Sequence, residues 1–168
     1  SVVVALGPWS QEILRPLGYK LPLAFERGYH LHFDLAEGNS LYRSVHDVDG
    51  AYVMTPMEQG LRVTCGVELN HRNAESNYAQ LEALKPKVAE AIGVDGQTAA
   101  APWRGSRPSF PDGKPVIGAA PKHENLWFAF GHGHIGLNTG PITGKLLSQA
   151  MCGEKTDIDL HGFRADRF

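Results

Sequence analysis

The sequence predicts an α+β fold, in which a mostly antiparallel sheet is flanked by helices and joined to a strand and a helix of a second, Rossmann-like unit. Strand-like segments follow one another from about residue 23 to residue 118 and are separated by turn signals at residues 47–50 and 58–60, a spacing typical of an antiparallel meander. The chain also opens with an apolar, β-branched run at residues 2–6. Such a run is typical of a buried parallel strand with neighbours on both sides.

The elements of the first half follow from apolar periodicity and from helix and strand breakers. Gly7 and Pro8 end the first strand, and Gly18 ends a short amphipathic helix at residues 9–17. Alternating side chains predict a long strand at residues 23–35. Further strands are expected near residues 40–46, 51–56 and 60–68.

A long helix is expected at residues 76–92, kinked or split at Pro86 because proline removes a backbone donor. Its core-facing stripe comprises Tyr78, Leu81, Leu84, Val88 and Ile92. The remaining expected elements are strands at 98–106, 115–118 and 126–130 and a last helix at 136–151. These elements predict three segments: an antiparallel domain at 23–118, and the segments 1–22 and 119–168 on either side of it, which belong to the edge of another domain.

Composition excludes several classes of protein. The 16 Lys and Arg residues are scattered and the net charge is −2, so neither a nucleic-acid partner nor a polybasic membrane anchor is expected. Cys65 and Cys152 stand alone, which argues against a disulfide scaffold or a cysteine-rich zinc site and favours the reducing cytoplasm.

A glycine-rich segment at residues 131–136 matches G-x-G-x-x-G between a strand and a helix. A dinucleotide site of this kind also needs a second parallel strand ending in an acidic residue, and too little chain follows residue 151 to supply one. We therefore favour a loop whose glycines and helix-start amides approach a planar or anionic ligand. A purely structural strand-to-helix turn is the alternative.

Other polar constellations are weaker. His30 with His32, and His132 with His134, have spacing that could bind a metal, but no carboxylate or thiolate cluster accompanies them, so no metal site is expected. Arg107 stands beside a rigid turn and could grip a substrate carboxylate with its planar fork. A surface ion pair is the alternative for this residue.

Five segments in order resemble the D-amino-acid oxidase-like family of FAD-dependent oxidoreductases, and most closely its bacterial D-amino-acid dehydrogenases. These segments are residues 2–10, 27–29, 105–108 with the following Pro-Asp-Gly turn, 131–137 and 167–168. The resemblance spans nearly the whole chain. It implies that this chain is the carboxyl-terminal part of such a flavoprotein, since the family's amino-terminal β-α-β unit has no counterpart here. It also implies that segment 1–22 is a remnant of the FAD-binding domain, that 23–118 is the substrate-binding domain, and that 119–168 returns to the FAD-binding domain.

The resemblance implies roles for particular residues. Arg107 matches the family's carboxylate-binding arginine, and Tyr52 resembles a sheet tyrosine that helps hold the substrate. Ser106 stands where a larger apolar residue is usual, which bears on pocket size. The residues implied to face FAD are Gly133, His134, Ile135, Gly136 and Leu137, together with Ala5, Gly7 and Trp9.

The implied reaction is oxidative deamination of a D-amino acid or related small amino acid, by hydride transfer from the α-carbon to the flavin. Electrons would then pass to oxygen or to a membrane-associated acceptor, the latter placing a cytoplasmic enzyme at the periphery of the inner membrane. We expect the isolated chain to hold no flavin tightly, and to self-associate through an exposed apolar edge. The alternative is a non-catalytic domain that binds a carboxylate ligand or a protein partner.

Overall fold

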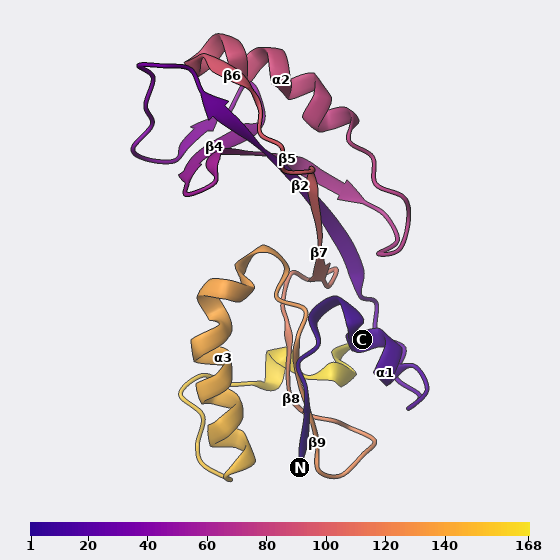
Figure 1. Cartoon of the computed structure of the whole chain (residues 1–168). Helices are drawn as coiled ribbons and strands as arrows, with labels where there is room; N and C mark the ends of the chain where they lie inside the picture. The colour runs from indigo at the N-terminus through magenta and orange to yellow at the C-terminus, as the bar shows by residue number, and fades with distance from the viewer. The chain divides into compact units, whose positions relative to one another are not determined.

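The computed structural model describes all 168 residues, which form two compact units (Figure 1). Unit 1 comprises Ser1–Glu26, Leu69–Arg72 and Ser106–Phe168, and unit 2 comprises Arg27–Glu68 and Asn73–Gly105. None of the helices is both long and apolar enough to cross a membrane.

Unit 1 is built on a three-stranded sheet with the order β1-β9-β8. Strand β1 (Val2–Val4) pairs in parallel with β9 (Leu126–Phe130), and β8 (Val116–Ala119) pairs antiparallel with β9. Helices α1 (Ser10–Leu14) and α3 (Gly136–Met151) lie on opposite sides of this sheet in Figure 1. The short 3-10 turns of this unit are η1 (Gly7–Trp9), η2 (Gly133–Ile135), η3 (His161–Phe163) and η4 (Ala165–Arg167).

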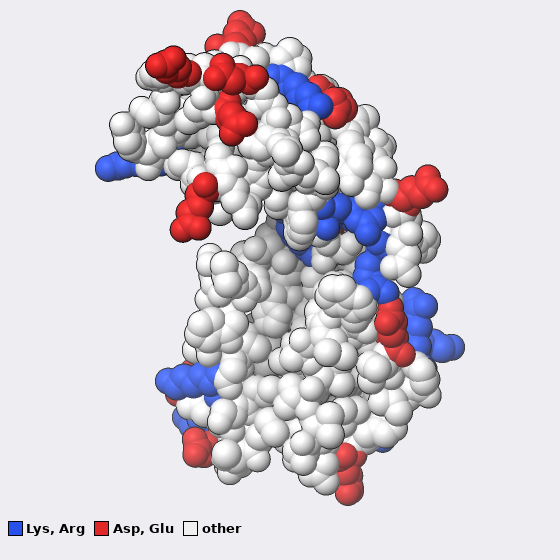
Figure 2. Space-filling view, in the orientation of Figure 1, with Lys and Arg blue, Asp and Glu red and all other residues white.

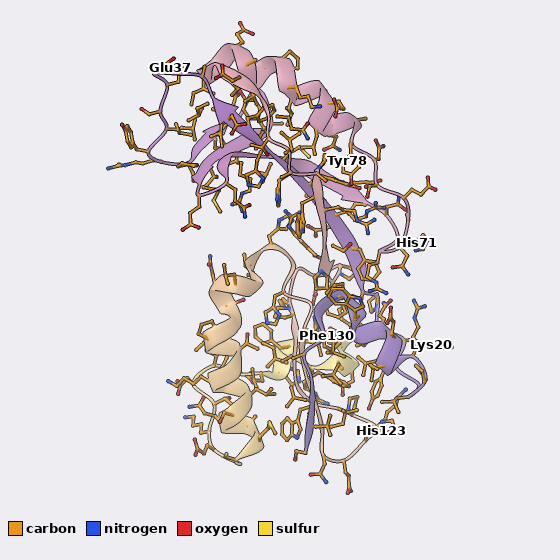
Figure 3. The ribbon with its side chains drawn as sticks, viewed as in Figure 1. Lys20, Glu37, His71, Tyr78, His123 and Phe130 are labelled. Carbon is orange, nitrogen blue, oxygen red and sulfur yellow. The ribbon has the colours of Figure 1, made fainter.

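An aromatic cluster fills the core of unit 1. Phe128 and Phe130 of β9 are fully buried, and Figure 3 labels Phe130 within this unit. The ring of Phe128 meets that of Tyr19 edge to face at 5.2 Å, an arrangement favoured by the ring quadrupoles. Leu14 is the buried apolar residue of α1 and joins the same cluster, which packs this short helix against the sheet.

Unit 2 is a six-stranded sheet in the order β3-β4-β5-β2-β6, with β7 also paired to β2. The strands are β2 (Ala24–Leu35), β3 (Val45–Asp47), β4 (Tyr52–Met57), β5 (Gly60–Leu69), β6 (Val94–Gln97) and β7 (Trp103–Ser109), and α2 spans Ala79–Ile92. From Ser106 onward, β7 belongs to unit 1. The predicted α+β class with a mostly antiparallel sheet is confirmed.

Helix α2 covers one face of this sheet. Its buried residues Leu81, Leu84 and Val88 form one core with alternate residues of β2, β4 and β5. The ring of Tyr78, labelled in Figure 3, meets that of Tyr29 at 5.6 Å. In Figure 2 the outer surface of this unit shows mostly acidic side chains, with a few basic ones among them. Because α2 packs against one face of the sheet, the opposite face is not covered by this helix.

Arg27 anchors the start of unit 2. Its side chain is fully buried, and Nη2 donates to the backbone oxygen of Glu75 at 2.6 Å while Nε lies 3.4 Å from the carboxylate of Glu68. The hydroxyl of Tyr29 donates to the same carboxylate. The Arg27-Gly28-Tyr29 segment therefore forms a buried polar support for the sheet.

Several predicted element boundaries were wrong. The predicted strand at 115–118 is β8, which pairs with β9 in unit 1 and not with the antiparallel sheet. A strand predicted at 98–106 is replaced by β6 and β7, on either side of residues 98–102. Pro86 lies inside α2 without splitting it. The three predicted domain segments stay a prediction.

Candidate active site

The end of β7 contacts the glycine-rich loop that follows β9. The backbones of Ser109 and His132 form an antiparallel bridge. A Cβ atom on Gly133 would lie 2.9 Å from the Ser109 side-chain oxygen. This strand end and this loop, all within unit 1, are therefore one structural element.

The loop has a backbone conformation that requires glycine at two positions. Gly131 has φ +88°, and a Cβ there would lie 2.2 Å from the Phe110 ring. Gly133 has φ +55°, in the left-handed region that side chains disfavour. The sequence motif is thus explained by close approach of the loop backbone to β7 and its neighbours.

Two histidines hold the loop in place. His132 Nε2 lies 3.0 Å from the hydroxyl oxygen of Thr143 on α3, and burial lowers the pKa of His132, which favours the neutral ring. His134 Nε2 lies within hydrogen-bond distance of a carboxylate oxygen of Glu26. No group of three or more His, Cys, Asp or Glu side chains gathers anywhere in the chain in a way that could hold a metal ion.

The start of α3 has no side-chain cap and lies next to exposed apolar side chains. Ile135 precedes the helix without a side-chain cap, and the first turn holds no acidic residue. Ile135 and Leu137 are 51% and 93% exposed. Uncapped amides carry partial positive charge, so this surface fits a planar ring that accepts hydrogen bonds or carries negative charge, such as a flavin.

Arg107 lies on β7, the strand whose end contacts the glycine-rich loop. Residues two apart on a strand share a face, so Arg107 points to the same side of β7 as Ser109. Its Nη1 atom is buried and has no hydrogen-bond partner. A buried donor without a partner costs on the order of 1–3 kcal/mol, and a charged donor costs more. The position of Nη1 therefore favours binding of an anionic ligand by Arg107.

Ala5, Gly7 and Trp9 lie at the same edge of the sheet as the loop. Because β1 and β9 are parallel, with Val4 opposite Phe128, their carboxyl ends meet at one edge. Ligands of α/β sheets bind at such edges. Gly7 has φ +53° with open space around it, and the Trp9 ring is 54% exposed beneath the guanidinium of Arg72, 5.2 Å away.

Tyr52 does not lie at an accessible surface. Its side chain is 2% exposed within the core between the sheet of unit 2 and α2. Burial and a hydrogen bond to Asp47 raise the pKa of its hydroxyl. The position of Tyr52 therefore gives no support to the expectation that it holds the substrate, because the core side of β4 faces away from solvent.

Sequence reasoning missed three residues that support the site. Ser109 could have been found from strand alternation, since it stands two residues after Arg107. Thr143 and Glu26 carried no local signal, because only the tertiary fold brings them to the histidines of the loop.

Comparison with known proteins places this site in a family context. Residues 1–150 match the family model described as FAD dependent oxidoreductase. The chain is 34% identical to a D-amino-acid oxidase of Bradyrhizobium diazoefficiens, over 100% of this chain and 41% of the relative. It is also 34% identical to a glycine oxidase of Pseudomonas putida, over 95% of this chain and 43% of the relative.

Solved structures show the same fold. The glycine oxidase of Geobacillus kaustophilus matches with a TM-score of 0.82 at 21% identity, covering 100% of this chain and 45% of that one. The iminodiacetate oxidase of Chelativorans sp. BNC1 matches with a TM-score of 0.74 at 24% identity, covering 98% and 45%. The chain thus spans less than half the length of these relatives.

Proposed function

This chain belongs to the family of FAD-dependent oxidoreductases, and we propose that it forms the substrate-binding and ring-facing part of an enzyme that oxidatively deaminates a D-amino acid or a related small amino acid. The observation that carries this proposal is the buried, unpaired Nη1 of Arg107 beside the Gly131–Ile135 loop. A fixed cation with a free donor next to a ring-binding surface is what an amino acid needs to be held by its carboxylate.

Arg107 would bind and orient the substrate. Its guanidinium can donate two parallel hydrogen bonds to a carboxylate, which fixes the direction in which the α-carbon points. Ser109 has a buried hydroxyl without a hydrogen-bond partner on the same side of β7. It can add a further hydrogen bond to a ligand held by Arg107.

The glycine-rich loop would hold the flavin ring. Gly133, His134, Ile135, Gly136 and Leu137 are the proposed contacts, and the exposed apolar surface of Ile135 and Leu137 suits a flat heterocycle. When bound, FAD supplies a two-electron acceptor for the hydride of the substrate α-carbon. Neutral His132, fixed by Thr143, and the His134–Glu26 pair keep the loop backbone in position.

No strong acid or base is required of this chain. If the substrate amine is held neutral, its lone pair assists departure of the hydride and an imino acid forms, so positioning and electrostatics dominate. The names of the two relatives favour a D-amino acid or glycine as the substrate class. We propose a cytoplasmic enzyme whose electrons pass to oxygen or to a membrane-associated acceptor.

The test joins this chain to the amino-terminal part of the Bradyrhizobium relative that it does not match. We expect the joined protein to bind flavin, and its flavin absorbance to bleach under anaerobic conditions when a small D-amino acid or glycine is added. A joined protein that holds flavin but is reduced by no amino acid would contradict the proposal. The unjoined chain, measured alongside, is expected to hold no flavin tightly.

A further inference from the structure

The sheet of unit 2 has an open face, defined here as the face opposite α2. Leu31 and Phe33 of β2 are buried in the core with α2, so the alternating residues His30 and His32 point to the open face. Their rings meet edge to face at 5.2 Å. The ring of His30 also stacks on that of Trp103 at 4.8 Å, which restricts the motion of both histidines.

Arg62 of β5 belongs to the same face. Its neighbours Leu61 and Val63 are buried in the core with α2, so the side chain of Arg62 points the other way. Thr55 of β4 lies directly opposite Arg62 in the pairing of β4 with β5.

The two strands β5 and β2 approach each other closely at two places, and these contacts fix Arg62 next to the histidines. A Cβ on Gly60 would lie 2.6 Å from the backbone oxygen of Phe33. Further along, the Cys65 thiol lies 3.9 Å from the backbone oxygen of Tyr29. Arg62 stands between these two contacts and therefore opposite the stretch of β2 that carries the histidine pair.

Thr98 completes the cluster. Its backbone amide donates to the backbone oxygen of His32 at 3.0 Å, directly after the paired residues Phe33 and Gln97 of β2 and β6. Residues opposite one another across an antiparallel pair share a face, so the Thr98 hydroxyl lies on the side of His32.

The cluster contains donors that no protein group satisfies. Arg62 Nε and Thr98 Oγ1 are both buried without a hydrogen-bond partner. Burial lowers the pKa of both His30 and His32, and the charge of Arg62 lowers it further. Asp34, the acidic residue that follows on this face of β2, forms no ion pair with Arg62. The guanidinium of Arg62 thus brings to the cluster a positive charge that Asp34 does not pair with.

We propose that Arg62, Thr98 and the His30–His32 pair form a binding site for a carboxylate on the open face of the sheet. The guanidinium supplies the charge and a planar pair of donors, and the hydroxyl and a neutral imidazole N–H supply further donors. The residues of this site all belong to unit 2, whereas Arg107 belongs to unit 1, and the assignment does not depend on the proposed oxidation.

The binding test uses this chain and isothermal titration with glutarate as the probe. We expect saturable binding of one glutarate and no binding of the uncharged glutaramide. Arg62→Gln should weaken glutarate binding at least about tenfold, because a charge-assisted pair is lost. Thr98→Val keeps the shape of the side chain and should weaken binding roughly threefold to tenfold. Arg43→Gln, at an exposed arginine of the same unit, should leave binding unchanged.

Circular dichroism confirms that each variant is folded before it is titrated. If Arg62→Gln does not fold, Thr98→Val together with glutarate-induced amide shifts at residues 30–32 and 98 in the parent carries the test. Absence of saturable glutarate binding by the parent would overturn the proposal, as would undiminished binding by folded Arg62→Gln or, in its place, by Thr98→Val.

A second titration identifies the source of the carboxylate. Binding of D-glutamate at least as tightly as glutarate assigns the site to the side chain of an acidic amino acid. A marked preference for glutarate assigns it to a free carboxylate without an amino group. Either result supports the carboxylate site. A preference for glutarate has no bearing on the proposed function of Arg107.

Discussion

The guanidinium of Arg167 holds the carboxylate of Asp112 with two hydrogen bonds, from Nε to Oδ2 at 2.8 Å and from Nη2 to Oδ1 at 3.2 Å. Nη2 also donates to the backbone oxygen of Lys114 at 2.7 Å, and the guanidinium lies 5.4 Å from the centre of the Phe110 ring. The pair therefore joins the chain end to the turn that follows β7. The hydrogen bonds from Arg167 lower the pKa of the Asp112 carboxyl.

Arg167→Ala should lower the free energy of unfolding by about 1–3 kcal/mol, since it removes charge-assisted bonds and a ring contact. Arg164 provides a matched control, because it pairs with Asp166 while both side chains are exposed, at 52% and 41%. Exposed pairs contribute roughly 0–1 kcal/mol, so Arg164→Ala should have a smaller effect. Urea unfolding of both variants measures the difference, and equal losses would mean that the Arg167 contacts are not special.

Gly133→Ala should destabilise the loop. The substitution adds a Cβ 2.9 Å from the Ser109 side-chain oxygen at a residue with φ +55°, so we expect a loss of roughly 1–2 kcal/mol. Gly140→Ala is the control, because Gly140 lies within α3 with nothing within 4 Å of its Cβ position. Alanine there should be neutral or stabilising by up to about 1 kcal/mol. Thermal unfolding of the two variants should therefore shift in opposite directions or by clearly different amounts.

Strong periodicity made some elements predictable from the sequence. The strand at 126–130 and the helix at 136–151 were placed at their observed bounds, because Gly131 and the apolar pattern on either side mark both. The start of α2 was placed three residues early, at 76 and not 79. Asn77 Oδ1 accepts a hydrogen bond from the Ala79 amide, so residues 77–79 form a local side-chain-to-backbone turn directly before the helix.

Strand partners were less predictable than strand positions. The segment 116–119 has the composition of any short apolar strand, and only its pairing with β9 assigns it to unit 1. In the same way, Arg107 could be chosen from its motif, but the sequence does not show that its Nη1 atom is buried without a hydrogen-bond partner. For Tyr52, the alternation of β4 predicts that successive side chains point to opposite faces, but it does not predict which face α2 covers.

Stability should fall as the pH drops below about 6.5. Burial lowers the pKa of His132 below its ordinary value of 6.5, so the unfolded chain takes up a proton at a higher pH than the folded chain. The free energy of unfolding therefore decreases as the pH falls from 6.5 toward the lowered pKa. Thermal unfolding between pH 8 and pH 5 measures this decrease, because the range extends roughly one and a half pH units on either side of the pKa of an unperturbed histidine.

His132→Asn should flatten part of that pH dependence. The pKa values of His30 and His32 are also lowered by burial, so these residues should retain the rest of it. His161→Asn, at an exposed side chain, controls for loss of an imidazole. A His132→Asn profile parallel to that of the parent would show that His132 does not contribute.

In the joined, flavin-containing protein, Arg107→Ala should damage use of the amino acid far more than flavin binding. Removing the carboxylate anchor should cost on the order of 2–4 kcal/mol of transition-state stabilisation, because the substrate carboxylate is left without its partner. This corresponds to roughly 30-fold to 1000-fold in kcat/KM. Arg107→Lys should fall between alanine and the parent, since lysine keeps the charge but loses the planar fork.

Steady-state kinetics with an amino acid, and with an amine of similar shape that lacks the carboxylate, separate an anchoring role of Arg107 from a structural one. The parent should strongly prefer the amino acid, and Arg107→Ala should lose most of this preference because its missing contact is to the carboxylate alone. Arg15→Ala, at an exposed arginine of the same unit, should keep the parent's preference. Equal losses on both substrates, or release of the flavin by Arg107→Ala, would instead mean that Arg107 supports the fold of the β7 end and that the carboxylate is held elsewhere.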